Sequence, residues 1–429
     1  MSTPLNKAVD EYVNKGLSRF HMPGHKGAEC FPDYYKYDIT EVAGADSLFE
    51  ASGAIREAEE RFAAIYGAGA SLLSAGGSTL CIQGMLATFL NPGDTVIMCR
   101  NCHASAVNAA ALLDLNIVWV NPRSHTELSA ALEQNPAAKA VYVTSPDYFG
   151  VLTDIASCSK LAHEHGAVLI ADNAHGAHLH FFPTEMHPIA LGADACADSL
   201  HKSLPVCTGG ALLHLRDKGL YNKAKAKMRL FGSTSPSYLI MLSADACIEY
   251  LETKARADFA LLGGRVANLR YRAFEHGLAP KTRNAEPARL TLSVVSTGMS
   301  TEEFSAALRE HEIEPEYVNS EWAVLMVSPF NTERDFERAA KFIDDTVGNG
   351  CSAFEERLFD MPKRSMSIRE ATFAESVLVK TGEAIGKTAA SLVLPCPPCI
   401  ALAAPGEIIN EELQGLLLKY GIEEINAVK

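Results

Sequence analysis

The chain alternates short apolar runs with stretches in which apolar residues recur at helical spacing. The runs at 95–99, 140–144 and 168–171 contain few polar residues, and amphipathic stretches at 103–113 and 155–165 lie between them. Short strands that are apolar on both faces are typical of a parallel sheet with helices on both sides. We therefore predict an α/β fold around a large, mostly parallel sheet.

The same pattern extends over most of the chain, which has 429 residues and so exceeds the size that one hydrophobic core usually serves. The further strands that we predict are 117–120, 193–197, 209–213, 290–295 and 323–327, and the further helices are 55–66, 127–134, 238–274, 301–311 and 411–420. The second alternation, after 274, predicts a smaller α+β domain. We predict an N-terminal segment at 1–45, a large domain at 46–275 and a small C-terminal domain at 276–429.

Composition excludes several classes of protein. A formal net charge of -14 offers no basic surface for nucleic acid or anionic lipid. We find no signal-peptide core and no apolar run of membrane-spanning length, so we expect a cytoplasmic protein. Most of the 11 cysteines then serve as small buried residues. The C-x-x-C at 396–399 lacks a second pair, which is weak evidence for zinc or redox chemistry.

Lys202 and Asp172 stand out among the polar residues. They lie 30 positions apart (202 minus 172), and each comes just after an apolar run. The carboxyl ends of parallel strands meet at one edge of a sheet, where ligands bind. A lysine amine can hold the aldehyde of pyridoxal 5'-phosphate (PLP), and an aspartate can keep its pyridine nitrogen protonated. Taken singly, a surface lysine and a salt-bridged or capping aspartate are the simpler interpretations.

Two further segments suit a phosphorylated, flat ligand. Ser78 and Thr79 follow two glycines at the start of a predicted helix, where free N–H groups and the helix dipole favour phosphate, although simple capping explains them equally well. His103 lies beyond the run at 95–99, where its imidazole could stack on an aromatic ring.

His175, His178 and His180 form the densest histidine cluster, and together with Asp172 they raise the question of a metal. On a strand, positions 178 and 180 share a face and 175 does not. This spacing matches no common set of metal ligands, so we predict no metal site here.

Several segments, taken together, resemble the PLP-dependent Orn/Lys/Arg decarboxylase family in its short form, whose fold is that of the aspartate-aminotransferase-like group (fold type I). They are RFHMPGHKG at 19–27, DITE at 38–41, NCH at 101–103, DNAHGAH at 172–178, SLHK at 199–202, STSPSY at 233–238, SIREA at 367–371 and PGE at 405–407. The resemblance covers nearly the whole chain. It implies a large PLP-binding domain with a mostly parallel seven-stranded sheet.

The resemblance also implies a role for each site residue. Lys202 would carry the cofactor, Asp172 would pair with the pyridinium nitrogen, and His103 and Ala174 would lie on opposite faces of the ring. His175 would lie near the imine and the ring hydroxyl. The residues that would hold the phosphate are Ser78, Thr79, Ser199 and His201, with Ser235 reaching the phosphate of a neighbouring subunit. A homodimer or larger homo-oligomer follows.

Some positions depart from the family pattern. Asn173 stands where Glu is common and Ala104 where Lys often follows the stacking histidine, while Cys399 and Ala401 replace an expected Gly and Pro. Because of these last two departures, the family pattern does not predict the residues at the substrate end of the site.

The predicted reaction is α-decarboxylation of arginine, lysine or ornithine, in which Lys202 or His175 returns the proton to the α-carbon. A basic side chain needs a carboxylate partner; the candidates are Asp38, Glu41, Asp46 and Glu50. Since fold does not decide chemistry, an aminotransferase or a β/γ-lyase is the first alternative. A histidine-based metalloenzyme and a binding protein without catalysis are the others.

Overall fold

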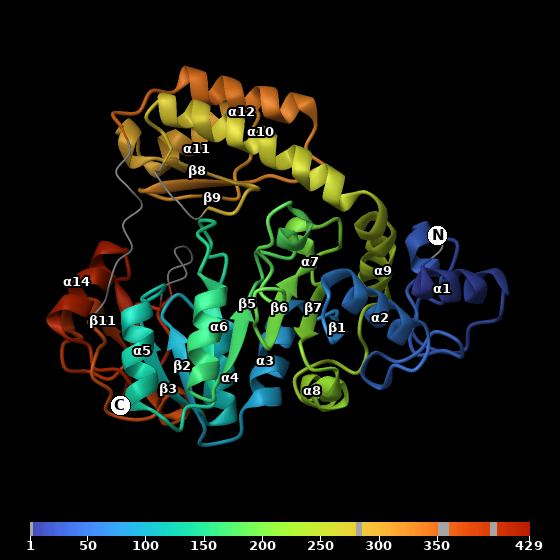
Figure 1. Cartoon of the computed structure of the whole chain (residues 1–429), viewed down its shortest axis with the longest axis horizontal. Coiled ribbons are helices and arrows are strands. Elements are labelled where there is room, and N and C mark those ends of the chain that lie inside the picture. Colours follow the sequence, from blue (N-terminus) through green and yellow to red (C-terminus); the bar gives the residue numbers. More distant parts are fainter. Residues whose placement is uncertain (1–2, 280–284, 351–359, 395–400) are drawn as a thin grey trace.

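A seven-stranded sheet forms the centre of the structure, a computed structural model that describes residues 3–279, 285–350, 360–394 and 401–429 (Figure 1). Its strands run in the order β1-β7-β6-β5-β4-β2-β3. They are β1 (Ala70–Ser74), β2 (Thr95–Cys99), β3 (Asn116–Val120), β4 (Ala140–Thr144), β5 (Val168–Asp172), β6 (Ala195–Ser199) and β7 (Ala211–Leu215). Strand β7 is antiparallel to both β1 and β6, and the other pairs are parallel. The predicted mostly parallel sheet is confirmed.

Helices cover both faces of this sheet, which explains why its strands are apolar throughout. The adjacent residues Leu72 and Leu73 are both fully buried, yet they belong to different hydrophobic clusters on opposite faces. The covering helices are α2 (Ala54–Tyr66), α3 (Gly77–Phe89), α4 (Ala104–Leu113), α5 (His125–Gln134), α6 (Ile155–Glu164) and α8 (Tyr221–Arg229). The predicted helices and strands of this region lie within a few residues of the observed ones.

The predicted helix at 238–274 is two helices. Helix α9 (Tyr238–Thr253) ends at Lys254, whose φ of -124° is not helical, and α10 (Ala255–Glu275) begins directly afterwards. Neither glycine nor proline marks this break in the sequence, so periodicity alone predicts one continuous helix. Helix α10 leads from the large sheet to the small domain (Figure 1).

Two small antiparallel sheets follow. The first has the order β8-β10-β9 and comprises β8 (Arg289–Ser293), β9 (Tyr317–Val318) and β10 (Trp322–Met326), with α11 (Thr301–Glu310) and α12 (Glu333–Asp345) beside it. The second pairs β11 (Ser376–Lys380) with β12 (Glu424–Val428) near α13 (Ile368–Phe373) and α14 (Glu411–Lys419). The elements that the sequence analysis missed are α8, α12, α13, β9, β11, β12 and the N-terminal helix α1 (Pro4–Asn14). The domain limits at 45 and 275 stay a prediction.

Short helical turns complete the described chain. They are α7 (Leu200–Ser203) and the 3-10 turns Asp33–Lys36, Leu48–Glu50, Leu179–Phe181, Lys218–Leu220, Val295–Thr297 and Thr381–Glu383. Among the described helices none has the length and apolarity that crossing a membrane requires.

A buried ion pair joins the C-terminal segment to the large sheet. Arg100, which directly follows β2, binds both carboxylate oxygens of Glu407, at 2.5 and 2.7 Å. Its guanidinium also donates to the carbonyl oxygens of Ala401 and Leu402. Because both charged groups are almost fully buried, this contact holds the C-terminal segment at a defined place.

Candidate active site

A cavity lies at the carboxyl ends of the central parallel strands. This edge of the large sheet faces the small domain (Figure 1). Its lining residues are Ser78, Ile82, Asn101, His103, Thr144, Asp147, Tyr148, Asp172, Ala174, His175 and Lys202. Six of the predicted site residues therefore line one cavity: Ser78, His103, Asp172, Ala174, His175 and Lys202.

Lys202 lies on α7, the single helical turn that follows β6. The preceding strand ends with buried Ser199, and the turn directs the amine of Lys202 into the cavity. The Nζ atom lies 2.9 Å from Nε2 of His175. An amine that is half-buried beside an imidazole is suited to bind an aldehyde.

Asp172 is the last residue of β5, and its side chain is buried. One carboxylate oxygen accepts from the backbone N–H of Ala174 at 3.0 Å, and the other accepts from the hydroxyl of Tyr142 at 3.2 Å. Burial and the charge of Asp172 raise the pKa of Tyr142 far above its ordinary value, so the tyrosine stays a donor. Within the described residues Asp172 forms no ion pair, which suits a carboxylate whose cationic partner is a ligand.

His103 and Ala174 come from different strand ends and line the same cavity. His103 is the N-cap of α4, and its Nδ1 accepts from the backbone N–H of Ser105 at 3.1 Å, which fixes the ring. Burial lowers the pKa of His103, the charge of Asp172 opposes that shift, and Lys202 adds to it. A neutral, fixed imidazole with an exposed face is suited to stack on an aromatic ring.

The predicted phosphate-binding residues lie around the start of α3, where Gly76 leaves the first N–H groups without a side-chain cap. Gly77 donates to the carbonyl oxygen of Gly209 at 2.8 Å, and the N–H of Gly209 donates to Nδ1 of His201 at 3.3 Å. Ser199 Oγ lies 3.2 Å from the same nitrogen. The chain thus brings Ser199 and His201 beside the helix start that carries Ser78 and Thr79.

Three of these residues, Thr79, Ser199 and His201, do not line the cavity as it is formed here. Ser235 lies apart from it, in an exposed segment after α8, where its N–H donates to Ser233 Oγ at 3.1 Å. The roles of these four residues remain predictions.

The sequence analysis missed five lining residues: Ile82, Asn101, Thr144, Asp147 and Tyr148. Both amide atoms of Asn101 and the hydroxyl oxygen of Thr144 are buried and have no hydrogen-bond partner in the described part of the chain. Buried polar atoms are normally paired, so unpaired ones beside a cavity indicate a polar ligand. Thr144 ends β4 and Asn101 follows β2, so the rule that ligands bind at strand ends could have found both.

The three clustered histidines have separate partners. His175 contacts Lys202, His178 lies 3.0 Å from Glu286, and Nε2 of His180 lies 2.9 Å from a guanidinium nitrogen of Arg256. Residues 178–181 form a turn and a short 3-10 helix, so the strand geometry assumed for 178 and 180 is wrong. The three imidazoles therefore do not converge on one point.

A second buried cluster surrounds Asp198 of β6. Asp198 Oδ2 lies 3.0 Å from Nε2 of His187 and 3.3 Å from Nε2 of His214, while its Oδ1 accepts from the side chain of Asn173 at 2.6 Å. Asn173 is thus held by a carboxylate, which gives a physical reason for its departure from the family pattern, because a Glu there would face a second negative charge.

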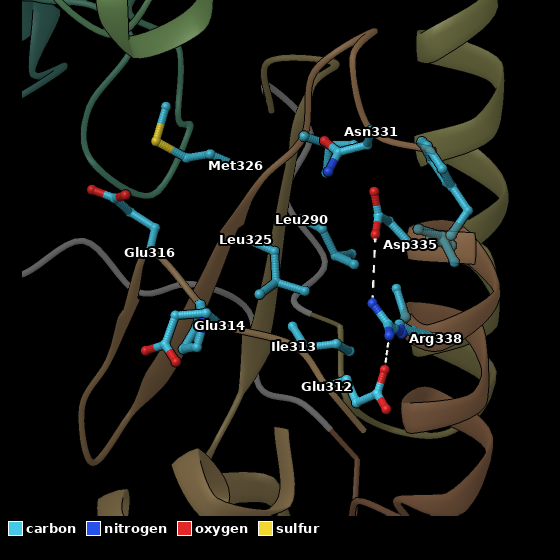
Figure 2. A pocket seen from close by; sticks show the side chains of 15 residues that line it. Leu290, Glu312, Ile313, Glu314, Glu316, Leu325, Met326, Asn331, Asp335 and Arg338 are labelled. Atoms are coloured by element: carbon cyan, nitrogen blue, oxygen red, sulfur yellow. Dashed lines mark ion pairs between the residues drawn. The ribbon is translucent and has the colours of Figure 1, made fainter. Parts of the chain in front are cut away.

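A separate groove of about 360 Å³ lies in the small domain, between its sheet and α12 (Figure 2). Glu312, one of its lining residues, is paired with Arg338 (Figure 2). The groove contains neither Lys202 nor Asp172, so the strand-end cavity is the better candidate for catalysis.

Four features of the strand-end cavity fit PLP: the amine of Lys202, the carboxylate of Asp172 without a cationic partner among the described residues, the exposed imidazole of His103, and the uncapped start of α3. They supply the covalent anchor, the counter-ion, the stacking group and the phosphate site that this cofactor requires. Lys202, Asp172, His103 and the N–H groups at the start of α3 would hold it.

Comparison with known proteins gives three similarities. An arginine decarboxylase of Halalkalibacterium halodurans is 28% identical over 95% of this chain and 91% of its own length. A constitutive lysine decarboxylase of Escherichia coli is 26% identical over 58% of this chain and 40% of its own length. The crystal structure of a lysine decarboxylase of Francisella novicida has a TM-score of 0.84 at 17% identity and covers 99% of this chain and 81% of that one.

The family model for the major domain of Orn/Lys/Arg decarboxylases matches residues 3–260, more than half of the chain. This match spans the large sheet, the cavity and Lys202. The protein belongs to the Orn/Lys/Arg decarboxylase family and is a PLP-dependent amino-acid decarboxylase.

Proposed function

We propose that this protein removes the α-carboxyl group of a basic amino acid as carbon dioxide, and that arginine is the first substrate to test. The relative that aligns over 95% of the chain is named an arginine decarboxylase, whereas the lysine decarboxylase of E. coli aligns over 58%. A homodimer with its active site at the subunit interface is part of the proposal.

The observation that carries the proposal is that the amine of Lys202 and the carboxylate of Asp172 line one cavity. When bound, PLP supplies a conjugated system that accepts the electron pair left on the α-carbon. Asp172 would hold the proton on the pyridine nitrogen, His103 would stack on the ring, and Lys202 would bind the aldehyde. In this proposal Lys202 or His175 delivers a proton to the α-carbon.

A basic side chain needs an anionic partner at the far end of the cavity. Within one chain, none of the carboxylates proposed from the sequence lines the cavity. Asp38 lies 3.1 Å from His25, Asp46 accepts from backbone N–H groups between 47 and 56, and Glu50 pairs with Arg229 at 2.7 Å. The fourth, Glu41, is exposed.

Glu316 of the small domain does not line the cavity either, but it contacts a residue that does. One of its oxygens accepts from the hydroxyl of Tyr148 at 3.1 Å, and Tyr148 lines the cavity with its ring centre 5.3 Å from that of His175. Glu316 also lines the groove of the small domain, on the side opposite α12 (Figure 2). Among the described residues Glu316 forms no ion pair, so its charge remains available for the distal cation of a substrate.

The test is a panel of amino acids given to the purified, PLP-loaded protein, with carbon dioxide, keto acid and ammonia all measured. We expect carbon dioxide in stoichiometric amount with the amine from arginine, or else from lysine or ornithine, and none from norleucine. Lys202→Ala should abolish turnover. Keto acid or ammonia without carbon dioxide would instead establish an aminotransferase or a β/γ-lyase.

A further inference from the structure

A buried line of charged and polar side chains connects the small domain to the amine of Lys202. His178 Nε2 lies 3.0 Å from Glu286, Glu286 lies 3.2 Å from Nε of Arg289, Arg289 Nη2 lies 3.4 Å from Nδ1 of His175, and His175 Nε2 lies 2.9 Å from Lys202. His178, Glu286 and Arg289 are each at most 2% exposed. Burying a charged side chain is costly in free energy, so a buried charge needs a partner.

The guanidinium decides which nitrogen of His175 carries hydrogen. Arginine has donors only, so the contact from Arg289 Nη2 requires a lone pair on Nδ1 of His175. The other nitrogens of Arg289 are directed elsewhere, Nη1 to the carbonyl oxygen of Tyr148 at 2.5 Å and Nε toward Glu286. The hydrogen of a neutral His175 must then lie on Nε2, which faces Lys202.

Several groups around His175 favour its neutral form. Burial lowers the pKa of His175 well below its ordinary value, and the charges of Lys202 and Arg289, followed by those of His103 and His178, lower it further. The ring of Tyr148 packs edge-on against His175. Asp147 and Asp172 line the same cavity but make their hydrogen bonds to other groups.

We propose that Arg289 is a positioning residue that holds His175 in the tautomer with hydrogen on Nε2, so that the imidazole donates to the amine of Lys202. An amine can accept that hydrogen bond only in its unprotonated form, which is the form that attacks an aldehyde. The inference rests on the proposed role of Lys202 but not on the identity of the substrate.

The position of Arg289 depends on how the small domain meets the large one. Arg289 begins β8, and Gly150 of the large domain accepts from the N–H of Glu286 at 2.7 Å. Gly150 has a φ of +87°, and a Cβ there would lie 3.1 Å from Cβ of Arg289, so glycine allows the arginine stem to approach. The reactivity of Lys202 is thereby coupled to the docking of β8.

The experiment measures Lys202 directly in the full-length protein after removal of the cofactor, with circular dichroism as the check of folding. The rate of reductive methylation of Lys202, followed by mass spectrometry of its peptide, is recorded against pH. In Arg289→Met we expect the half-maximal rate to move up by about one pH unit, because His175 can then accept from a protonated Lys202. Arg289→Lys, which keeps a donor at this position, should produce a smaller shift than Arg289→Met.

Arg270 offers a matched control. It is a half-buried arginine of α10 that donates to the backbone of Glu286 and Arg289 but does not contact His175. Arg270→Met should therefore leave the labelling profile of Lys202 in place, whatever it does to stability.

A double-mutant cycle tests whether Arg289 acts through His175. In the His175→Ala background, Arg289→Met should produce no further shift. An equal shift in that background would show that the charge of Arg289 acts directly on Lys202 and would overturn the proposal, as would an unchanged profile in Arg289→Met. If the protein released carbon dioxide from no amino acid in the panel, the labelling result would still stand, because labelling requires no substrate.

Discussion

Three glutamates of one short segment differ in their partners. Glu312 pairs with Arg334 at 3.2 Å and with Arg338, and Glu314 pairs with Arg309 at 2.7 Å. Glu316 has the Tyr148 hydroxyl instead. A neutral hydroxyl leaves the negative charge of Glu316 uncompensated, which distinguishes this residue from its two neighbours.

We predict that Glu316→Gln raises KM for the basic substrate by about 10- to 100-fold with little change in kcat. A hydrogen bond to a charged group contributes about 1.5–3 kcal/mol, which corresponds to this range. Steady-state kinetics on arginine, lysine and ornithine measures it. Glu314→Gln, which removes a charge that already has its partner, should have no such effect. Equal losses in the two variants would show that Glu316 does not bind the substrate.

At the scale of elements, the pairing of β5 with β6 depends on a buried carboxylate. Asp198 of β6 holds Asn173, the residue after β5, and contacts His214 of β7. Burial by itself would raise the pKa of Asp198, but the charges of His187 and His214 and their hydrogen bonds hold it well below its ordinary value. A depressed pKa stabilises the fold at pH values above the ordinary one, and this stability is lost as acid protonates the group.

Asp198→Asn should lower the free energy of unfolding by about 3 kcal/mol at pH 7, because the variant leaves buried histidines without their anion. The difference from the wild type should persist from pH 8 to pH 5 and narrow below about pH 4, near the pKa of an unfolded aspartate. Urea denaturation at several pH values measures it. Asp33→Asn, at an exposed pair with Lys36, is the control and should change nothing measurable. A pH-independent difference would contradict this account.

At the scale of the whole molecule, the chain exposes large apolar side chains in its N-terminal segment. Phe20 is 95% exposed and Met22 is 67% exposed, and both belong to the segment that resembles the family. Leu230 is also exposed and lies just before the 233–237 segment, which the resemblance assigns to a subunit contact. Exposed apolar side chains of this size suit a surface that a second copy covers.

We expect light scattering during gel filtration to give at least the mass of a dimer at micromolar concentration. Phe20→Glu should shift the mass toward the monomer, since a charge would be buried at the interface. Leu261, which is 67% exposed on α10, provides a matched control, and Leu261→Glu should leave the mass unchanged. A wild-type protein that remains monomeric would refute the dimer.

Much of the site follows from local rules. Asp172 ends one apolar strand and Lys202 follows the next, so the rule that ligands bind at strand ends places both at one edge before any coordinates are known. The same rule applies to His103 and Ala174, which follow the ends of β2 and β5. Ser78 lies in the first turn of α3. The break at Lys254 and the paired strands β11 and β12 were not predictable in this way, since no turn residue marks the first and the second depends on contacts between distant segments.

The sequence by itself determined the α/β pattern, the strand ends and the two residues that point to PLP, because hydrophobic periodicity is a local property. Only the tertiary structure decided that Arg289 reaches His175 and that Tyr148 meets Glu316. Arg289 lies 114 positions beyond His175, and Glu316 lies 168 positions beyond Tyr148. Contacts over such separations arise when the small sheet packs against the large one, and no local pattern encodes that packing.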